Sequence, residues 1–275
     1  MLTQAPKGTK DVTPREAYRW QYAEALMRAQ AAKYGYREIR TPGFEHTELF
    51  LRGVGDTTDV VQKEMYTFLD KGERSITLKP EGTAGAARAF LEHGLFNEPL
   101  PLKMFYFTPV YRYEKPQSGR LREHHQFGVE AFGGSEPTLD AEVILLGWNV
   151  LNAFGLNDLT LYINSIGCPT CRKAYNEALK AYFAEKQLCE TCQSRLERNP
   201  MRILDCKDPD CGRDADGAPV ISDYLCDECR AHFQSLQALL RAMDVPFRVN
   251  PRIVRGLDYY TKPCLRSPRL WTEAN

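Results

Sequence analysis

Polar side chains that could bind a charged ligand gather on two predicted strands near the middle of the chain. Residues 104–112 and 125–132 are rich in aromatic and β-branched residues, which is typical of strands. Side chains two positions apart on a strand share a face, so Gln126, Gly128 and Glu130 should lie together. A glycine among them lets a ligand approach the sheet closely. This face suits a charged small molecule; the alternative is the solvated face of an ordinary hairpin. The opposite face, predicted to point into the core, carries Phe127, Val129 and Ala131.

The segment that joins these strands is net basic. Residues 113–124 contain Pro116 and Gly119, which predicts a long hairpin connection. Arg112 and Glu114 are predicted to share a face where the first strand ends. Residues 112–124 hold four basic and two acidic groups, the basic ones being Arg112, Lys115, Arg120 and Arg122. Such a loop suits a polyphosphate or the end of a nucleic acid, and the alternative is a solvated charged turn.

Two further segments place polar groups beside a glycine. Residues 80–83, PEGT, precede an alanine-rich helix that should end at Gly94, and Thr83 is predicted to cap its start. Residues 255–260, RGLDYY, put an arginine, an aspartate and two phenols beside a glycine, after a predicted strand. By spacing alone, neither segment specifies a ligand.

Eight of the nine cysteines lie between residues 168 and 229, in four pairs. Clustered cysteines in a reducing compartment indicate metal binding before disulfides. A closed zinc site takes four thiolates, so four pairs permit two sites. The sequence leaves the pairing open, although joining the first pair with the second and the third with the fourth gives the shortest loops. The alternatives are free buried thiols or a zinc-ribbon nucleic-acid module. The predicted ligands are Cys168, Cys171, Cys189, Cys192, Cys206, Cys211, Cys226 and Cys229.

Composition and charge limit the classes of function. The chain has 275 residues, and its 36 basic and 36 acidic side chains cancel, so any contact with nucleic acid requires a local patch. The fractions of charged residues, 26%, and hydrophobic residues, 43%, are typical of a soluble globular protein. No run of about 18 apolar residues is present, and the first residues lack the apolar stretch of a signal peptide. We therefore expect a cytoplasmic protein.

Helices and strands alternate around the polar hairpin. Thr13 and Pro14 predict the start of a helix, with Glu16 completing a capping box and Gly35 as its stop. Further helices are predicted over 139–154 and 231–243, and further strands over 36–40, 75–79, 159–166 and 247–254. This order favours an α+β fold with an antiparallel sheet. A doubly wound nucleotide-binding fold is less favoured, because its glycine-rich turn is missing.

Five stretches, taken in order, resemble the histidyl-tRNA synthetases, a family of class II aminoacyl-tRNA synthetases. FTPVYRYEKPQSGRLREHHQFGVEAFG resembles the second class II motif, and YREIRTPGFEHTELFLRGVG the first, with Pro42 as its key proline. KGTKDVTP resembles the family's opening, TLKPEGTAGAARAFLEHGL its amino-acid-binding segment, and IVRGLDYYT a histidine-specific motif. The resemblance covers residues 6–262 and implies a class II antiparallel sheet flanked by helices.

The resemblance implies a histidine–tRNA ligase that forms histidyl-adenylate from histidine and ATP and then transfers histidine to the 3′ end of tRNA(His). Glu81 and Thr83 would hold the α-amino group of histidine. Gln126 would contact the backbone end of histidine near its reacting carboxylate. Glu130 and Tyr260 would hydrogen-bond the imidazole. Tyr259 belongs to the same implied histidine-binding set.

The implied ATP site uses the two arginines and the hairpin loop. Arg112 and Arg255 would contact the α-phosphate from opposite sides as the catalytic residues. Glu114 would lie near the adenine and Arg120 near the outer phosphates. Mg²⁺ would be bound mainly to ATP, and the family implies a homodimer formed through the first motif. Two alternatives are a non-catalytic paralogue that regulates histidine biosynthesis and a zinc-dependent nucleic-acid-binding protein.

Compared with the family, the sequence predicts an incomplete enzyme. Residues 1–166 and 245–262 would form the catalytic core without its third motif, and residues 167–244 a cysteine-rich, zinc-binding insertion. Residues 263–275, including Cys264, would be an aberrant tail, and the anticodon-binding domain would be absent. We therefore expect a C-terminally truncated chain that is inactive by itself.

Overall fold

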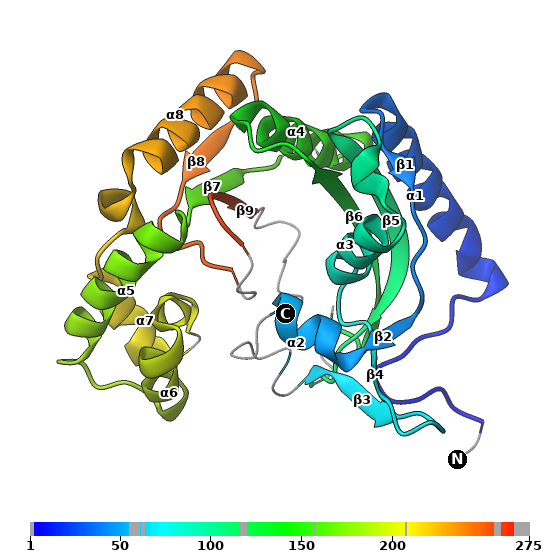
Figure 1. The fold of residues 1–275 in the computed structure, drawn as a ribbon, viewed down its shortest axis with the longest axis horizontal. Coiled ribbons are helices and arrows are strands. Elements are labelled where there is room, and N and C mark those ends of the chain that lie inside the picture. Colours follow the sequence, from blue (N-terminus) through cyan, green and yellow to red (C-terminus); the bar gives the residue numbers. More distant parts are fainter. Residues whose placement is uncertain are drawn as a thin grey trace. The chain divides into compact units, whose positions relative to one another are not determined.

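The computed structural model describes residues 3–54, 61, 64–115, 120–156, 158–206, 208–255 and 260–266. These residues form two compact units, each described here by itself (Figure 1). The first unit comprises residues up to 135 together with those from 142 to 156, and the second comprises 136–141 and the described residues from 158 onward. Both units mix helices with short sheets. No helix in the described ranges is long and apolar enough to cross a membrane.

The first unit is built on a long antiparallel hairpin (Figure 1). β5 (Leu102–Tyr111) and β6 (Glu123–Phe132) pair over their full length, and β1 (Arg37–Glu38) lies parallel to β5 on its other side. The register sets Tyr106 opposite Gly128 and Thr108 opposite Gln126. The predicted hairpin is therefore confirmed, although β5 ends one residue before Arg112.

One face of this hairpin forms the core of the first unit. α1 (Pro14–Lys33) and α4 (Pro137–Ala153) contribute Ala31, Leu146 and Val150 to a cluster with Phe105. Because side chains alternate along a strand, the other members of this face fall two residues apart. They include Phe107, Phe127, Val129 and Ala131, so the predicted core face of β6 is confirmed. The opposite face is left to the polar residues.

A second small sheet and two helices complete the first unit. β2 (Phe44–His46), β4 (Ser75–Leu78) and β3 (Tyr66–Leu69) pair antiparallel in the order β2-β4-β3. The Thr77 hydroxyl lies 2.9 Å from the hydroxyls of both Thr47 and Thr67, which ties the sheet together. α2 (Thr47–Val54) follows β2, and α3 (Thr83–Glu92) and the 3-10 helix η2 (Leu95–Asn97) follow β4.

The second unit consists of a three-stranded sheet and a series of helices. β7 (Leu161–Ser165) lies between β8 (Phe247–Val249), which is parallel to it, and β9 (Pro263–Arg266), which is antiparallel. The chain between β7 and β8 forms, in order, α5 (Pro169–Phe183), α6 (Glu190–Arg198), η3 (Pro200–Asp205), α7 (Pro209–Asp216), η4 (Ile221–Tyr224) and α8 (Asp227–Ala242). The core joins Tyr175, Leu179 and Phe183 of α5 to four buried cysteines of these helices.

Several predicted elements differ from the structure. The predicted strand 247–254 stops at Val249, because the Asn250 side chain accepts a hydrogen bond from the Arg252 amide, 2.9 Å, and turns the chain. Thr13 precedes α1 as predicted, but its side chain makes no capping hydrogen bond, and Glu16 pairs with Lys10 instead. β9 and the buried Cys264 lie within the predicted tail.

Candidate functional site

Two hydroxyl groups bind the carboxylate of Glu130 on the polar face of the hairpin. Gln126 and Glu130 lie on this face of β6, and the start of α3 lies against it. The Thr83 hydroxyl donates to Glu130 Oε1 at 2.7 Å, and the Tyr106 hydroxyl donates to the same oxygen at 3.1 Å. Among the described residues, no hydrogen bond reaches the other oxygen, Oε2. The carboxylate is thus fixed through one oxygen, and the other remains for a ligand.

The start of α3 is arranged around the carboxylate of Glu81. Glu81 is 3% exposed, and its two oxygens accept from the amides of Thr83 and Ala84, each at 2.8 Å. The prediction that Thr83 caps this helix is therefore wrong: Gly82 is the cap position, and the Glu81 carboxylate satisfies the free amides. Because the Thr83 hydroxyl is not used for capping, it is available to Glu130.

Gln126 is held by the same turn. Its Oε1 accepts from the Gly82 amide at 3.0 Å, which ties β6 to the residue before α3. Glu81, Thr83, Gln126 and Glu130, which come from two distant sequence segments, are thus brought together in the structure. Their hydrogen-bonding groups can hold an ammonium and a second N–H donor side by side.

Tyr106 is a site residue that the sequence interpretation missed. It is 3% exposed, lies opposite Gly128 in the register, and its ring fills the space beside two glycines. A Cβ on Gly82 or on Gly128 would lie 2.3 Å from this ring, so both positions require glycine. An aromatic residue paired across a hairpin with glycine is a recognisable signal, but it appears only once the register is known.

Burial changes the electrostatics around Glu130. Burial raises the pKa of Glu130, whereas the hydrogen bonds from Thr83 and Tyr106 oppose this rise. Burial also raises the pKa of Tyr106, so its hydroxyl stays protonated and remains a donor. A carboxylate that is desolvated and lacks a cation in the described structure favours an incoming donor that is positively charged or strongly polarised.

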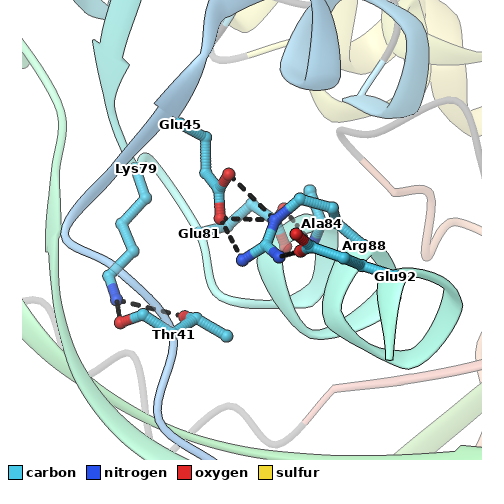
Figure 2. A network of polar contacts seen from close by, with 7 residues as sticks. All are labelled: Thr41, Glu45, Lys79, Glu81, Ala84, Arg88 and Glu92. Carbon is cyan, nitrogen blue, oxygen red and sulfur yellow. Dashed lines mark hydrogen bonds and ion pairs between the residues drawn. The ribbon is translucent and has the colours of Figure 1, made fainter. Parts of the chain in front are cut away.

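A network of charged groups supports the start of α3 from the other side. Figure 2 shows Arg88 of α3 between Glu45 and Glu92. Arg88 Nη2 and Nε donate to Glu45 Oε1 at 2.8 and 3.0 Å, and Glu45 is only 8% exposed. Nearby, the buried Lys79 Nζ donates to the carbonyl oxygen of Thr41 at 3.3 Å, and burial lowers its pKa. This paired network holds the helix that carries Thr83.

The basic residues at the end of the hairpin are partly engaged within the chain. Arg112 Nε donates to the carbonyl oxygen of Pro80 at 2.9 Å, which places its guanidinium beside the 80–83 turn. Arg120 pairs with Glu114 at 3.2 Å, and the Arg122 guanidinium lies 3.9 Å from the centre of the Tyr113 ring. Arg112, Glu114 and Arg120 are therefore gathered at one end of the polar face; residues 116–119 lie outside the described structure.

The remaining predicted histidine and phosphate ligands belong to the second unit. Arg255 Nη2 donates to the Tyr260 hydroxyl at 3.2 Å, and its guanidinium lies 4.7 Å from the centre of the Tyr260 ring. Tyr259 lies outside the described residues. The structure thus brings Arg255 and Tyr260 together.

The eight clustered cysteines form two sets of four. We call Cys168, Cys171, Cys226 and Cys229 the outer cysteine set, and Cys189, Cys192, Cys206 and Cys211 the inner cysteine set. Within each set the four sulfurs lie within 4.8 Å of one another. Cys168 Sγ is 3.5 Å from Cys171 Sγ, and Cys189 Sγ is 3.9 Å from Cys206 Sγ. Four thiolates around one Zn²⁺ at about 2.3 Å would be separated by about 3.8 Å, so both sets fit this ion.

The local backbone favours thiolates at both sets. Cys168, Cys189 and Cys226 are the N-cap residues of α5, α6 and α8, where the helix dipole favours negative charge. The Cys226 amide donates to Cys171 Sγ at 3.1 Å, and the Cys189 amide donates to Cys211 Sγ at 3.3 Å. Interaction with the backbone amide of Cys171 lowers the pKa of the Cys168 thiol to about 6. The pKa of the Cys189 thiol is lowered in the same way, whereas burial raises the pKa of the Cys192, Cys211 and Cys229 thiols.

Comparisons with known proteins agree on one family. The sequence profile of the family "Histidyl-tRNA synthetase" matches residues 8–208. The histidine–tRNA ligases of Clostridium novyi and Caldanaerobacter subterraneus are each 62% identical over 264 residues, which cover 95% of this chain and 64% and 63% of theirs. The crystal structure of apo S. aureus histidyl-tRNA synthetase matches with a TM-score of 0.76 at 40% identity, over 96% of this chain and 61% of that chain. This chain therefore spans under two thirds of the length of these relatives.

Proposed function

This chain belongs to the histidyl-tRNA synthetase family. We therefore propose that its function is that of a histidine–tRNA ligase. The reaction joins histidine to ATP as histidyl-adenylate, releases pyrophosphate, and transfers histidine to the 3′ end of tRNA(His). The relatives at 57–62% identity are named histidine–tRNA ligases, so the paralogue that regulates histidine biosynthesis is not favoured. If the chain were instead a zinc-dependent nucleic-acid-binding protein, the polar groups around Glu130 would have no role.

The observation that carries this proposal is the arrangement around Glu130. Its carboxylate is fixed by two hydroxyl donors on one oxygen, and the other oxygen can accept an imidazole N–H. A buried acceptor of this kind rejects amino acids that lack the donor, since the unpaired carboxylate would stay desolvated. We assign Tyr106 a positioning role, because it acts on histidine through Glu130.

The neighbouring groups suit the rest of the amino acid. Glu81 and Thr83 would receive the α-ammonium, and Gln126 would contact the end of histidine that carries the carboxylate. The resemblance also implies that Tyr260 and Tyr259 contact the imidazole. The carboxylate of histidine then attacks the α-phosphorus of ATP. The bond from that phosphorus to the oxygen that bridges it to the β-phosphate breaks, and pyrophosphate leaves.

Arginines are suited to this phosphoryl chemistry. The attack gathers negative charge on the α-phosphate oxygens, and a guanidinium meets two such oxygens in a fixed geometry. Arg112 and Arg255 are the proposed catalytic residues, with Glu114 near the adenine and Arg120 near the outer phosphates. ATP would enter with Mg²⁺ bound to its phosphates, and few protein ligands are needed for an ion held in this way.

We also propose a homodimer and a cytoplasmic location. Apolar side chains of β2, α2 and β3 are exposed on the first unit: Phe44 55%, Leu51 41%, Phe68 48% and Leu69 67%. A single-chain surface with this many exposed apolar groups is suited to a partner. The same region contains Pro42, which matches the proline of the first class II motif.

Zn²⁺ is the structural cofactor that we propose for the segment 167–244, which we interpret as an insertion in the catalytic core. Both cysteine sets have the sulfur spacing of closed four-thiolate sites, and closed zinc sites stabilise small domains without taking part in catalysis. About two zinc equivalents per chain are expected by elemental analysis.

The test of the ligase is histidine-dependent exchange of labelled pyrophosphate into ATP. It should be run with this chain and with a protein extended to the length of the curated relatives. In the extended protein, we expect exchange that requires histidine and is lost when Arg112 is replaced by alanine. Absence of exchange in the extended protein would refute the proposed function.

A further inference from the structure

The two cysteine sets are nested along the chain. The outer cysteine set joins the first pair to the last, and the inner cysteine set joins the two pairs between them. In the sequence, α6, η3, α7 and η4 therefore lie between the two pairs of the outer set. The inner set contacts only the ends of α6, η3 and α7. Loss of one set should consequently have a different structural result from loss of the other.

The outer cysteine set lies against the end of the RGLDYY-containing segment. Gly167, next to Cys168, accepts from the Lys262 amide at 3.0 Å, and the Ile166 amide donates to the Lys262 carbonyl at 2.9 Å. Glu228, between Cys226 and Cys229, pairs with Lys262 Nζ at 3.1 Å. Lys262 is thus held beside both cysteine pairs of the outer set, by the backbone before Cys168 and by the first turn of α8.

Two backbone features mark this junction, which also continues the pairing of β7 with β9 at Ser165 and Pro263. Lys262 has a φ of 58°, a left-handed conformation that a non-glycine residue keeps only when its surroundings hold it. Gly167 has a φ of 64°, and a Cβ there would lie 2.6 Å from the Cβ of Cys171. Tyr260 itself packs against the core cluster, which contains the buried cysteines of both sets, so the backbone contacts of Gly167 and Lys262 are what link residue 262 to the outer set.

The inner cysteine set shares the core with the outer set but has separate hydrogen bonds. Asp208 Oδ1 accepts from the amides of Asp210 and Cys211 at 3.0 and 3.1 Å, and this caps the start of α7 beside the set. The described hydrogen bonds of its four cysteines stay within the segment 188–212. None of these hydrogen bonds reaches a described residue between 255 and 266.

We infer that the outer cysteine set is a Zn²⁺ site that positions Tyr260 and Lys262, whereas the inner cysteine set is a Zn²⁺ site that holds only α6, η3 and α7. This inference rests on the proposed zinc and on the proposed role of Tyr260 in histidine binding. Each ion would replace the protons of four thiols, which are released to solvent, and form four Zn–S bonds without any redox change. The outer ion would act on histidine through Lys262 and Tyr260, as a positioning element.

A matched pair of substitutions separates the two sites. Cys229 and Cys192 are each the buried second cysteine of a C-x2-C pair and the third residue of a helix. Zinc per chain is counted by native mass spectrometry in the unsubstituted protein, Cys229→Ser and Cys192→Ser. Hydrogen exchange is followed at the Ile166 and Lys262 amides, whose hydrogen bonds report the junction. Neither measurement requires ligase activity, so a failure here is distinct from a failure of the proposed function.

We expect two zinc ions in the unsubstituted protein and one in each variant. Exchange at residues 166 and 262 should become at least about tenfold faster in Cys229→Ser and stay within about twofold in Cys192→Ser. Equal acceleration in both variants, or none in Cys229→Ser, would overturn the inference, as would a zinc count of two in either variant or none in the unsubstituted protein.

Two further measurements keep the test decisive if Cys229→Ser does not fold. In the unsubstituted protein, stepwise chelation should accelerate exchange at residues 166 and 262 together with the loss of only one of the two ions. Glu228→Gln should keep both ions and accelerate exchange at Lys262 by a smaller factor than chelation does. If exchange at this junction does not follow either ion, the outer set does not position the segment.

Discussion

The polar hairpin of the first unit and the cysteine-rich region of the second unit hold their polar atoms in different ways. In the hairpin, strand register places Gln126, Gly128 and Glu130 on one face, and an aromatic core covers the other. In the cysteine-rich region, short helices place sulfurs at their first turns, and half of those sulfurs are themselves part of the core.

This difference shows what each region requires to keep its shape. The hairpin has a ladder of backbone hydrogen bonds and an apolar face, so its polar face is fixed without a ligand. The helices between α5 and α8 are short, and helices of this length depend on tertiary contacts. Their sulfurs supply these contacts, and a metal ion would strengthen them. The following predictions test this contrast.

Removal of metal should have the largest effect, and only in the second unit. Structural zinc sites in small domains contribute about 10–16 kcal/mol of apparent binding free energy. Chelation should therefore remove hydrogen-exchange protection from residues 168–229 and leave β5 and β6 protected. Exchange followed by mass spectrometry checks this. Equal loss of protection in β5 and β6 would contradict the contrast between the two regions.

Glu130→Gln should separate binding from stability in the first unit. We expect a loss of histidine affinity of about 100-fold, since a charged hydrogen bond contributes about 1.5–3 kcal/mol. Calorimetric titration with histidine measures this loss.

The same substitution should stabilise the protein without ligand. Burial raises the folded-state pKa of Glu130 above its unfolded value, so its favourable contribution is present at low pH and is lost as pH rises through the folded pKa. Glutamine keeps the acceptor for Thr83 and Tyr106 but has no charge. The Tm of Glu130→Gln should therefore exceed that of the unsubstituted protein at pH 8, with a smaller gain at pH 5. A lower Tm at pH 8 would refute this account.

Gly128→Ala should destabilise the first unit by about 1–3 kcal/mol, because the added methyl group overpacks against the Tyr106 ring. Urea unfolding monitored by tyrosine and tryptophan fluorescence measures this change. Gly147→Ala is a matched control in the same unit, since a Cβ there meets no atom within 4 Å. The zinc content of Gly128→Ala should be unchanged; a loss of metal would show that the two regions are not independent.

Tyr106→Phe should have the smallest effect. Loss of one hydrogen bond to Glu130 costs about 0.5–1.5 kcal/mol, so histidine affinity should fall about two- to tenfold. This hydroxyl also lowers the pKa of Glu130, so the pH profile of histidine binding should shift to higher pH in the variant. A fall in affinity without this shift would indicate a purely structural role for Tyr106.

Periodicity predicted the hairpin well but not the details that depend on tertiary contacts. The alternation of Gln126 to Ala131 gave the two faces correctly, because a strand has a period of two whatever surrounds it. The role of Thr83 was wrong, since the preceding Glu81 supplies both capping oxygens, and no local rule favours one over the other. Tyr106 could not be identified without the register that sets it opposite Gly128.

The cysteine pairing shows a second limit of sequence reasoning. Spacing identified all eight sulfurs, but short loops favoured a sequential pairing, and the structure has a nested one. Loop length changes the cost of closure only slowly. The packing of α5 against η3 and η4 therefore outweighs it and brings the first pair to the last.

Nested ligand sets also impose an order on synthesis. As the chain leaves the ribosome, the inner cysteine set is complete once Cys211 has emerged, whereas the outer set must wait for Cys229. With Zn²⁺ bound as proposed, α6, η3 and α7 could receive their ion before Cys226 and Cys229 have been synthesised. A chain interrupted after Cys211 would already carry the complete inner set, and only continued translation would add the junction at Lys262.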